Sequence, residues 1–462
     1  MSGGTAGFVV DLNRCTGCRA CELACVITNG LPPDSAWREV RDFNASHVPG
    51  VESFHLSLAC HHCAEAPCMV QCPSRAFFRD PGTGAVLIDD SKCLGCGYCA
   101  WVCPWDAPRF DEDRGVMTKC TLCHERLGEG VAPACVTGCP TAALGWSTEL
   151  GDEPLPSIPG FAMADTNPAL CLVPLGESRT VPRVTEPPAM PPREVCAPAG
   201  PRVTLAGEWP LALFTFLLAL LAGLFVASRF GAPAPDWRLF SGAGLAGLLF
   251  SALHLGRKGR AWRAGMHADA SWLSREVLFY GGFLLAGTIS LWLDGGGSWL
   301  GWTAAVLGLA AALSADMVYR VARIRGSGLL HSALVLPTAL FIAAAASGAL
   351  NAALVISTLK MALYVARKVA RQRQGLAIRP LCSLVRVGLL AAGSIWLARV
   401  PGPAPLPVLL MILAAELVDR CELYDELEIP TPSVLMREEL EKKRSGRHRE
   451  PPTSGSRWKY VG

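Results

Sequence analysis

The chain reads Cys15-Thr16-Gly17-Cys18-Arg19-Ala20-Cys21-Glu22-Leu23-Ala24-Cys25 near its start. A grouping of four cysteines recurs three more times before residue 140, so that sixteen of the twenty cysteines lie in four runs. Three of the runs end on Cys-Pro, whereas the first ends on Cys25-Val26. The four runs are Cys15, Cys18, Cys21 and Cys25; Cys60, Cys63, Cys68 and Cys72; Cys93, Cys96, Cys99 and Cys103; and Cys120, Cys123, Cys135 and Cys139.

The spacing of these cysteines predicts what they bind. The first and third runs follow C-x2-C-x2-C-x3-C, the ferredoxin pattern in which three thiolates hold one [4Fe-4S] cluster and the fourth holds a neighbouring cluster. The second and fourth runs lengthen one interval, Cys63 to Cys68 and Cys123 to Cys135, without changing the number of ligands. Sixteen thiolates therefore predict four [4Fe-4S] clusters.

Two other uses of the cysteines remain open. Paired C-x2-C thiolates also suit zinc, but a zinc site does not need a third cysteine after two more residues and a fourth before Pro. A disulfide framework is typical of small secreted chains, whereas ligand thiols must stay reduced until iron arrives. The other four cysteines fall outside every run, and we predict no ligand role for Cys171, Cys196, Cys382 and Cys421.

The second half of the chain has the composition of a membrane domain. Only 18 % of all residues are charged and the mean hydropathy is +0.32, with the apolar excess concentrated after residue 205. About 20 consecutive apolar residues span a bilayer as a helix, and small residues, as in 242–247, let such helices approach closely. Buried helices of a soluble domain are the alternative. We predict eight spans, at 208–228, 239–255, 276–293, 299–318, 329–350, 352–366, 382–398 and 406–418.

These patterns predict a multidomain fold. An N-terminal α+β ferredoxin-like double module would occupy residues 1–178, and a C-terminal all-α eight-helix transmembrane bundle residues 206–421. Residues 179–205 are rich in proline, which sustains neither helix nor central strand, and they predict a linker. Residues 422–462 predict a charged, largely mobile tail. The first ten residues lack the basic start and apolar core of a signal peptide.

Basic residues are distributed unevenly among the predicted loops. The second, fourth and sixth loops hold thirteen Lys and Arg, and the opposite loops hold three. Because cytoplasmic loops are enriched in Lys and Arg, we predict a multi-pass protein of a bacterial cytoplasmic membrane, in contact with lipid and not nucleic acid, with the cluster domain on the cytoplasmic side. The alternative is that the basic loops form a docking surface for that domain. The thirteen are Arg257, Lys258, Arg260, Arg263, Arg275, Arg320, Arg323, Arg325, Arg367, Lys368, Arg371, Arg373 and Arg379.

Both halves resemble parts of one known assembly. The four cysteine runs, over about residues 7–175, resemble the four-cluster subunit of dimethyl sulfoxide reductase-type molybdoenzymes. The second half resembles the membrane anchor of the same complexes in Glu208-Trp209-Pro210-Leu211, in His254-Leu255-Gly256 followed by Arg260-Ala261, and in Ser274-Arg275-Glu276. The chain therefore resembles two subunits fused into one polypeptide.

This resemblance implies several functional features. Substrate chemistry would occur on a separate molybdopterin-containing catalytic subunit, and this chain would carry electrons between that partner and the quinone pool. The anchor would bind quinone, either menaquinone or ubiquinone, with functional roles for His254 and Glu276. The first run would pair with the fourth and the second with the third. The cluster ligands would then be Cys15, Cys18, Cys21 and Cys139; Cys120, Cys123, Cys135 and Cys25; Cys60, Cys63, Cys68 and Cys103; and Cys93, Cys96, Cys99 and Cys72.

The chemistry of quinones supports the same residues independently. Quinone reduction moves protons together with electrons, and histidine exchanges protons near neutral pH. His254 ends the second predicted span and Glu276 begins the third on the same side, and an ionisable residue at membrane depth is a functional candidate. Arg260 is a further candidate, which would stabilise a quinone oxygen. The alternative is that His254 and Glu276 only face the headgroups or cap a helix.

Three other functions stay open. A b-type haem would need two axial histidines, for which His254 and His331 are the candidates. Coupling of electron transfer to ion movement would need a chain of buried ionisable residues, for which Asp316, Lys360 and Glu416 are the candidates. A membrane-tethered ferredoxin for soluble partners would form no stable complex with a large subunit. The sequence is compatible with either direction of electron flow.

Overall fold

The computed structural model describes residues 6–147 apart from 34, then 150, 155–156, 158–159, 161 and 166–176, and finally 203–444 apart from 295–298, 322–330, 374–377, 400–401, 428 and 430. Contacts divide the chain into two units. The cluster unit comprises residues 1–200 and 430–462, and the helical unit comprises residues 201–429. Positions 177–202, which include most of the predicted linker, lie outside the described residues.

Short strands and short helices alternate in the cluster unit. Strand β1 (Gly7–Asp11) lies at the centre of a three-stranded sheet, antiparallel to β8 (Leu144–Ser147) and parallel to β9 (Leu170–Val173). A hairpin follows each of the first three cysteine runs: β2 (Glu39–Phe43) with β3 (Phe54–Leu58), β4 (Phe77–Arg79) with β5 (Val86–Ile88), and β6 (Arg109–Asp111) with β7 (Val116–Thr118). The helices are α1 (Ala20–Asn29), α2 (Pro67–Val70), α3 (Tyr98–Val102), α4 (His124–Gly128) and α5 (Ala134–Thr137).

The four cysteine runs share one backbone feature. Two residues separate the first two cysteines of each run, and the second of these residues has a positive φ in all four cases. This left-handed conformation is open to glycine but strained for other side chains, so its appearance at a histidine and a leucine shows that the repeated loop overrides local preference. The four residues are Gly17 (φ 68°), His62 (φ 44°), Gly95 (φ 69°) and Leu122 (φ 60°).

The Cys-Pro ending separates three runs from the first. In the three Cys-Pro runs, the third residue after the last cysteine is left-handed and donates its N–H to that cysteine's carbonyl, which turns the chain away. In the first run Val26 replaces Pro, and α1, which has ten residues, continues past Cys25 to Asn29 and ends at Gly30 (φ 59°). The turning residues are Arg75 (φ 51°), Asp106 (φ 60°) and Ala142 (φ 48°).

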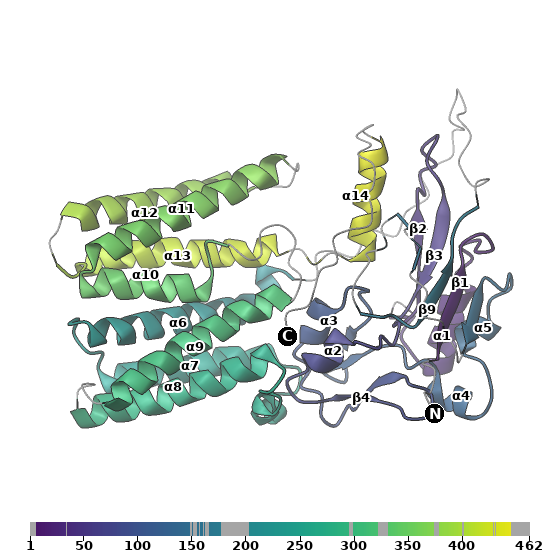
Figure 1. The fold of residues 1–462 in the computed structure, drawn as a ribbon, viewed down its shortest axis with the longest axis horizontal. Coiled ribbons are helices and arrows are strands. Elements are labelled where there is room, and N and C mark those ends of the chain that lie inside the picture. The colour runs from purple at the N-terminus through teal and green to yellow at the C-terminus, as the bar shows by residue number, and fades with distance from the viewer. Residues whose placement is uncertain are drawn as a thin grey trace. The chain divides into compact units, whose positions relative to one another are not determined.

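The described part of the helical unit contains eight α-helices, one at the place of each predicted span. Five are long and apolar enough to cross a membrane, and a sixth candidate is α7 together with the short 3₁₀ helix η2, which bends from it by 108°. Figure 1 shows these helices running side by side. They are α6 (Leu205–Arg229), α7 (Trp237–Leu253), α8 (Trp272–Asp294), α9 (Trp299–Val321), α10 (Val335–Ser347), α11 (Leu350–Arg373), α12 (Pro380–Arg399) and α13 (Leu406–Glu426), with η2 at Lys258–Gly265.

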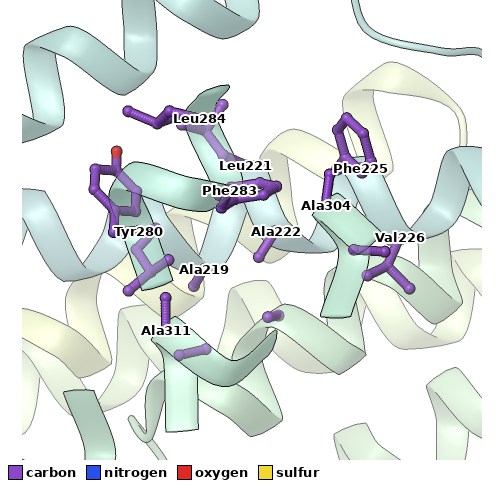
Figure 2. Packing of buried hydrophobic residues seen from close by; sticks show 14 of the residues in the cluster. Ala219, Leu221, Ala222, Phe225, Val226, Tyr280, Phe283, Leu284, Ala304 and Ala311 are labelled. Carbon is purple, nitrogen blue, oxygen red and sulfur yellow. The ribbon is translucent and has the colours of Figure 1, made fainter. Parts of the chain in front are cut away.

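Aromatic rings and alanines interlock in the core between α6, α7, α8 and α9 (Figure 2). The rings of Phe225, Phe240 and Phe283 pack with centroids 5.2–5.6 Å apart. On α7, a Cβ added to Gly247 would lie 2.6 Å from the Tyr280 hydroxyl, so only glycine lets α8 pack this closely. Tyr280 in turn donates a 3.1 Å hydrogen bond to the Gly244 carbonyl. This packing holds the start of α8 against the end of α7.

Three helices differ most from their predicted spans. Helix α10 begins at Val335 and has thirteen residues, whereas the predicted span began at 329, outside the described residues. Helices α11 and α13 extend beyond 366 and 418 because their charged ends pair with one another, as Lys368 does with Glu422 at 2.8 Å. Arg367 and Lys368, which we predicted to be loop residues, are therefore buried in α11.

The predicted C-terminal tail also differs. Residues 422–426 belong to α13, and Pro432–Arg444 form α14 in the cluster unit, where α14 packs against β2 (Figure 1). Met436 is buried, and Lys443 pairs with Glu52 and lies 5.7 Å from the Phe43 ring centre. Apolar burial and this ion pair give structure to a segment whose charge predicted none. Positions 445–462 lie outside the described residues.

Candidate cluster and quinone sites

The cysteines of the first and fourth runs line two hollows. The first hollow has a volume of about 340 Å³, open space included, and contains the thiols of Cys15, Cys18, Cys21 and Cys139. The second hollow has a volume of about 280 Å³ and contains the thiols of Cys25, Cys120, Cys123 and Cys135. Each hollow therefore takes three cysteines from one run and the last cysteine from the other. These are two of the ligand sets that the family resemblance implies.

The last cysteines of the second and third runs also interact with the other run. The thiol of Cys68 interacts electrostatically with Cys103, Cys60 and Cys63. The thiol of Cys99 interacts with Cys96, Cys72 and Cys93, and also with Cys68 of the other set. Electrostatic interactions therefore link the cysteines of the second and third runs, and the two ligand sets that these runs would form stay a prediction.

Most of the cysteine thiols are buried, which disfavours their charged form. Burial raises the pKa of Cys63 to about 11 and the pKa values of Cys96 and Cys103 to about 12. Such thiols stay protonated at neutral pH unless a positive charge compensates the thiolate, and metal ligation supplies that charge. The donor set and its burial therefore fit a metal cluster held by four thiolates.

Backbone amides support the sulfur atoms. Amide hydrogen bonds stabilise negative charge on sulfur and are one of the means by which a protein sets a cluster's reduction potential. Two of them arise because the left-handed Gly95 and Leu122 turn their N–H groups toward the first cysteine of the run. The bonds, all of 3.4 Å, run from Gly95 and Met117 to Cys93 Sγ, from Ala76 to Cys72 Sγ, and from Leu122 to Cys120 Sγ.

Two buried cations lie beside the cysteines and were not predicted. Arg38 is 2 % exposed in the wall of the second hollow, and Lys119 is 3 % exposed and donates to the carbonyls of Val86 and Cys120. Lys119 directly precedes the predicted ligand Cys120, so its position in the sequence could have indicated a cation beside that cluster. Arg38 begins a hairpin thirteen residues beyond Cys25, where no pattern marked it.

The remaining cysteines lie outside the hollows. Cys171 is exposed on β9, and Cys382 and Cys421 lie partly buried on α12 and α13 of the helical unit. Cys196 lies outside the described residues. The prediction that these four have no ligand role stays a prediction.

The predicted quinone residues lie at one end of the helical unit. His254 terminates α7, Glu276 lies in the second turn of α8, and η2, which contains Arg260, joins the two helices. Glu276 is 4 % exposed and, among the described residues, has no hydrogen-bond or ion-pair partner. The charged group that acts on it most is the Asp316 carboxyl on α9. His254 is half-buried, and its Nδ1 likewise has no hydrogen bond within the described chain.

The second haem candidate is engaged elsewhere. Both ring nitrogens of His331 contact the Arg367 guanidinium, and Nδ1 also accepts a 3.0 Å hydrogen bond from Ala333 N–H. A histidine held in this way offers no free nitrogen to a haem iron. The structure therefore gives no support to the pair of His254 and His331 as axial ligands.

Asp316, Lys360 and Glu416, the predicted ion-coupling residues, belong to a buried polar network. Lys360 Nζ lies 2.9 Å from Glu416 Oε2 and donates to Thr338 Oγ1, also at 2.9 Å. Asp316 accepts hydrogen bonds from the N–H groups at the start of α10, with Val335 at 2.6 Å. The sequence therefore identified three members of the network correctly as buried charges.

Further members of the network come from the ends of α11, α12 and α13. Asp419 lies 3.0 Å from Arg367 and 3.1 Å from Arg386, and all three side chains are buried. Lys368 pairs with Glu422 at 2.8 Å and with Glu426 at 2.5 Å. Cations and carboxylates alternate, so charge is compensated locally inside the helical unit.

Comparisons with known proteins concern the cysteine-rich part. Residues 51–149 match a family described as a 4Fe-4S dicluster domain. The B component of the anaerobic dimethyl sulfoxide reductase of Escherichia coli is 39 % identical over 146 residues, which cover 30 % of this chain and 71 % of that protein. The B component of the sulfite dehydrogenase of Allochromatium vinosum is 36 % identical over 157 residues, 29 % of this chain and 65 % of that protein. The thiosulfate reductase electron transfer subunit of Salmonella typhi is 38 % identical over 138 residues, 29 % of this chain and 71 % of that protein.

Proposed function

The chain belongs to the family of dimethyl sulfoxide reductase iron-sulfur subunits, and from this premise we propose that it is the electron-transfer and quinone-reactive membrane subunit of a respiratory molybdopterin oxidoreductase complex. The family match concerns the cysteine-rich part, about three tenths of the chain. The observation that carries the proposal is that one polypeptide has two hollows, each lined by four cysteines from two runs, and an apolar helical unit in which Glu276 is buried.

Each cysteine set would hold one [4Fe-4S] cluster. The first hollow would use Cys139 as the ligand from the distant run, and the second would use Cys25. Bound clusters would supply one-electron carriers, whereas quinone chemistry exchanges electrons in pairs. The protein's own contribution is the set of amide donors and fixed charges around sulfur, together with the burial that excludes water.

His254 and Glu276 would manage the protons at the quinone site. Oxidation of a quinol releases two protons with two electrons, so a group near the ring must accept the first proton. His254 Nδ1 is open to that role, and Glu276 would orient the ring hydroxyl or receive the second proton. Arg260 on η2 would stabilise a developing negative oxygen. The same groups return protons when electrons flow toward quinone.

A mutation series tests these roles. The clusters of purified chain are reduced with a soluble dye, and the rate of their reoxidation by a quinone analogue is measured. We expect His254→Ala and Glu276→Gln to slow this step at least about tenfold, because a positioned proton-transfer group contributes on the order of 10²- to 10⁴-fold. His267→Ala, in the same connection between α7 and α8, is the matched control and should be nearly normal. Normal rates in both test variants, with iron content intact, would remove these residues from the site.

Substrate chemistry would belong to a molybdopterin-containing partner. Two of the compared relatives are named as parts of reductases and one as part of a dehydrogenase, so the proposal covers both directions of electron flow. Affinity purification of the full chain from its own membranes should recover a large subunit together with molybdenum. A membrane-tethered ferredoxin would purify without such a partner, and that result would contradict this part of the proposal.

The side of the membrane is a further part of the proposal. If all eight helices cross, both flanks of the helical unit lie on one side, together with the basic residues of η2 and of the ends of α9 and α11. The excess of Lys and Arg there supports the cytoplasmic side of a bacterial inner membrane. A reporter fused after Gly462 should therefore behave as cytoplasmic, and a periplasmic signal would reverse the placement.

The buried network supports ion coupling as a second candidate function. Asp316 interacts electrostatically both with Glu276 and with the Lys360 and Arg420 side chains, so ionisable groups continue from the proposed quinone residue into the bundle. Protein reconstituted in vesicles with an internal pH dye should then show proton uptake or release during quinone turnover, and Lys360→Met should abolish it without stopping turnover. Turnover with no pH change in the wild-type vesicles would assign the network a structural role only.

A further inference from the structure

Arg38 lacks the partner that a buried cation requires. Its side chain lies in the wall of the second hollow and is 2 % exposed, with the guanidinium carbon 4.1 Å from the centre of the Phe8 ring. Nη1 donates to Ser57 Oγ at 3.1 Å and to the Ser57 carbonyl at 3.4 Å. Nε and Nη2 have no oxygen or nitrogen acceptor among the described residues. Besides Ser57, the side-chain hydrogen-bond partner of Arg38 is the thiol of Cys135, a predicted cluster ligand.

No carboxylate neutralises Arg38 within the described part of the chain. Several more exposed arginines of this unit pair with carboxylates, as Arg19 does with Asp42 at 3.3 Å and Arg109 with Glu39 at 2.9 Å. A buried, unpaired charge is strongly unfavourable, and native proteins avoid it unless a ligand or metal centre compensates it. The missing anion must therefore come from outside the set of acidic side chains.

The electrostatic neighbours of Arg38 identify where that anion lies. They are the thiols of Cys135, Cys120 and Cys21. Cys135 and Cys120 line the second hollow, and Cys21 lines the first, where its Sγ lies 3.5 Å from the same Ser57 hydroxyl. Four thiolates outweigh the positive charge of an iron-sulfur core, so a cluster in the second hollow would carry the negative charge that Arg38 faces.

We infer that Arg38 raises the reduction potential of the cluster held by Cys25, Cys120, Cys123 and Cys135. This inference rests on the proposed cluster ligands. A cluster in the second hollow would become more negative when it accepts one electron from a neighbouring cluster, and no bond would break. A fixed cation would therefore stabilise the reduced cluster more than the oxidised one. Arginine stays charged at any physiological pH, so the effect does not depend on protonation.

Redox titration of the full chain, followed by electron paramagnetic resonance, tests the inference. Arg38→Met removes the charge at similar length, Arg38→Gln keeps a donor for Ser57, and Arg38→Lys keeps the charge. Both neutral variants should lower the potential of one cluster by at least the equivalent of a tenfold change in its reduced-to-oxidised ratio, which is about 59 mV for a one-electron couple. Arg38→Lys should shift it much less.

Two control variants show whether the effect is specific. Arg19→Gln removes a cation near the first hollow whose side chain is 42 % exposed and already paired with Asp42, and it should leave all potentials unchanged. Lys119→Met removes the other buried cation, whose electrostatic effect falls on Cys68, and it should move the signal of a different cluster. A shift of the same signal by a similar amount in all variants would overturn the inference, because the effect would then not depend on the charge at position 38.

Every outcome of the series decides the question. Unchanged potentials in Arg38→Met and Arg38→Gln, with iron content intact, would overturn the inference. Loss of this one cluster in the neutral variants but not in Arg38→Lys would still show that the charge is needed, whereas loss in Arg38→Lys as well would assign Arg38 a packing role through Ser57. A wild-type chain without this cluster would contradict the proposed function rather than the role of Arg38.

Discussion

The two units place buried cations in opposite surroundings. In the helical unit, buried Lys360, Arg367 and Arg386 each lie within about 3 Å of a carboxylate on α13. In the described part of the cluster unit, buried Arg38 and Lys119 have no carboxylate and lie beside cysteines instead. These three pairs form as the chain folds, although Nη1 of Arg420, another buried cation of that unit, has no hydrogen-bond partner among the described residues. Arg38 and Lys119 lie beside predicted cluster ligands instead, so we interpret them as charges that an anionic cofactor compensates.

The largest effect should follow from removing the anion in the cluster unit. Cys135→Ala takes one ligand from the second hollow and leaves Arg38 buried without compensation. Iron content should fall from about sixteen to about twelve atoms per chain, since each cluster holds four, and one of four cluster signals should disappear. Metal analysis and resonance spectra measure both.

A matched cysteine provides the control for this loss. Cys171→Ala removes an exposed thiol on β9, outside every run, and should leave iron and spectra unchanged. Zinc in stoichiometric amount with little acid-labile sulfide in the wild-type chain would contradict the cluster assignment. It would also leave Arg38 with an anionic neighbour but no reducible centre, because zinc held by four thiolates is negatively charged but has no redox chemistry.

A smaller effect is expected where the anion belongs to the chain. Lys360→Met or Glu416→Leu alone should lower the free energy of unfolding of the helical unit by about 3–5 kcal/mol, because each leaves its partner buried and unpaired. The double variant should recover much of this loss, since apolar side chains can replace a buried pair at little cost. Unfolding in detergent, followed by helical circular dichroism, measures the three values. Additive losses would mean that the pair is not self-contained.

The smallest effect is expected for an ion pair on the surface. Arg114 pairs with Asp90 in the cluster unit, and their side chains are 51 % and 46 % exposed. Asp90→Asn should change the free energy of unfolding by no more than about 1 kcal/mol, because water screens exposed charges. If Asp90→Asn lowered the free energy of unfolding as much as Lys360→Met does, burial would not be what distinguishes buried ion pairs from surface ion pairs.

In the cluster unit, the sequence predicted those features that depend on the number of residues between cysteines. The interval between cysteines determines which thiols can share a cluster, and the exchange of Cys25 and Cys139 between runs appears in the structure as the family resemblance implies. The change from Pro to Val26 was visible as well, and its consequence is the longer helix α1. Arg38 could not be predicted, because its role depends on a fold that brings the start of β2 beside two distant runs.

The helical unit was predicted well in its apolar parts and poorly at its charged ends. A hydropathy window interprets Arg367 on α11 and Asp419 on α13 as the ends of two spans, yet the two side chains pair at 3.0 Å and both helices continue. Pairing between helices is a tertiary effect that the sequence of one helix does not contain. The same holds for α14, whose buried Met436 anchors a segment that composition alone assigned to a mobile tail.

If one chain joins a quinone site to its own clusters, the purified wild-type protein should pass electrons between them without a partner subunit. Its clusters are reduced with dithionite, the excess is removed without air, and an oxidised quinone analogue is added while the cluster absorbance is followed. We predict rapid reoxidation in the absence of any partner subunit, and a loss of this rate in His254→Ala. Clusters that stay reduced in the presence of the quinone analogue, yet are reoxidised at once by a soluble dye, would contradict the claim.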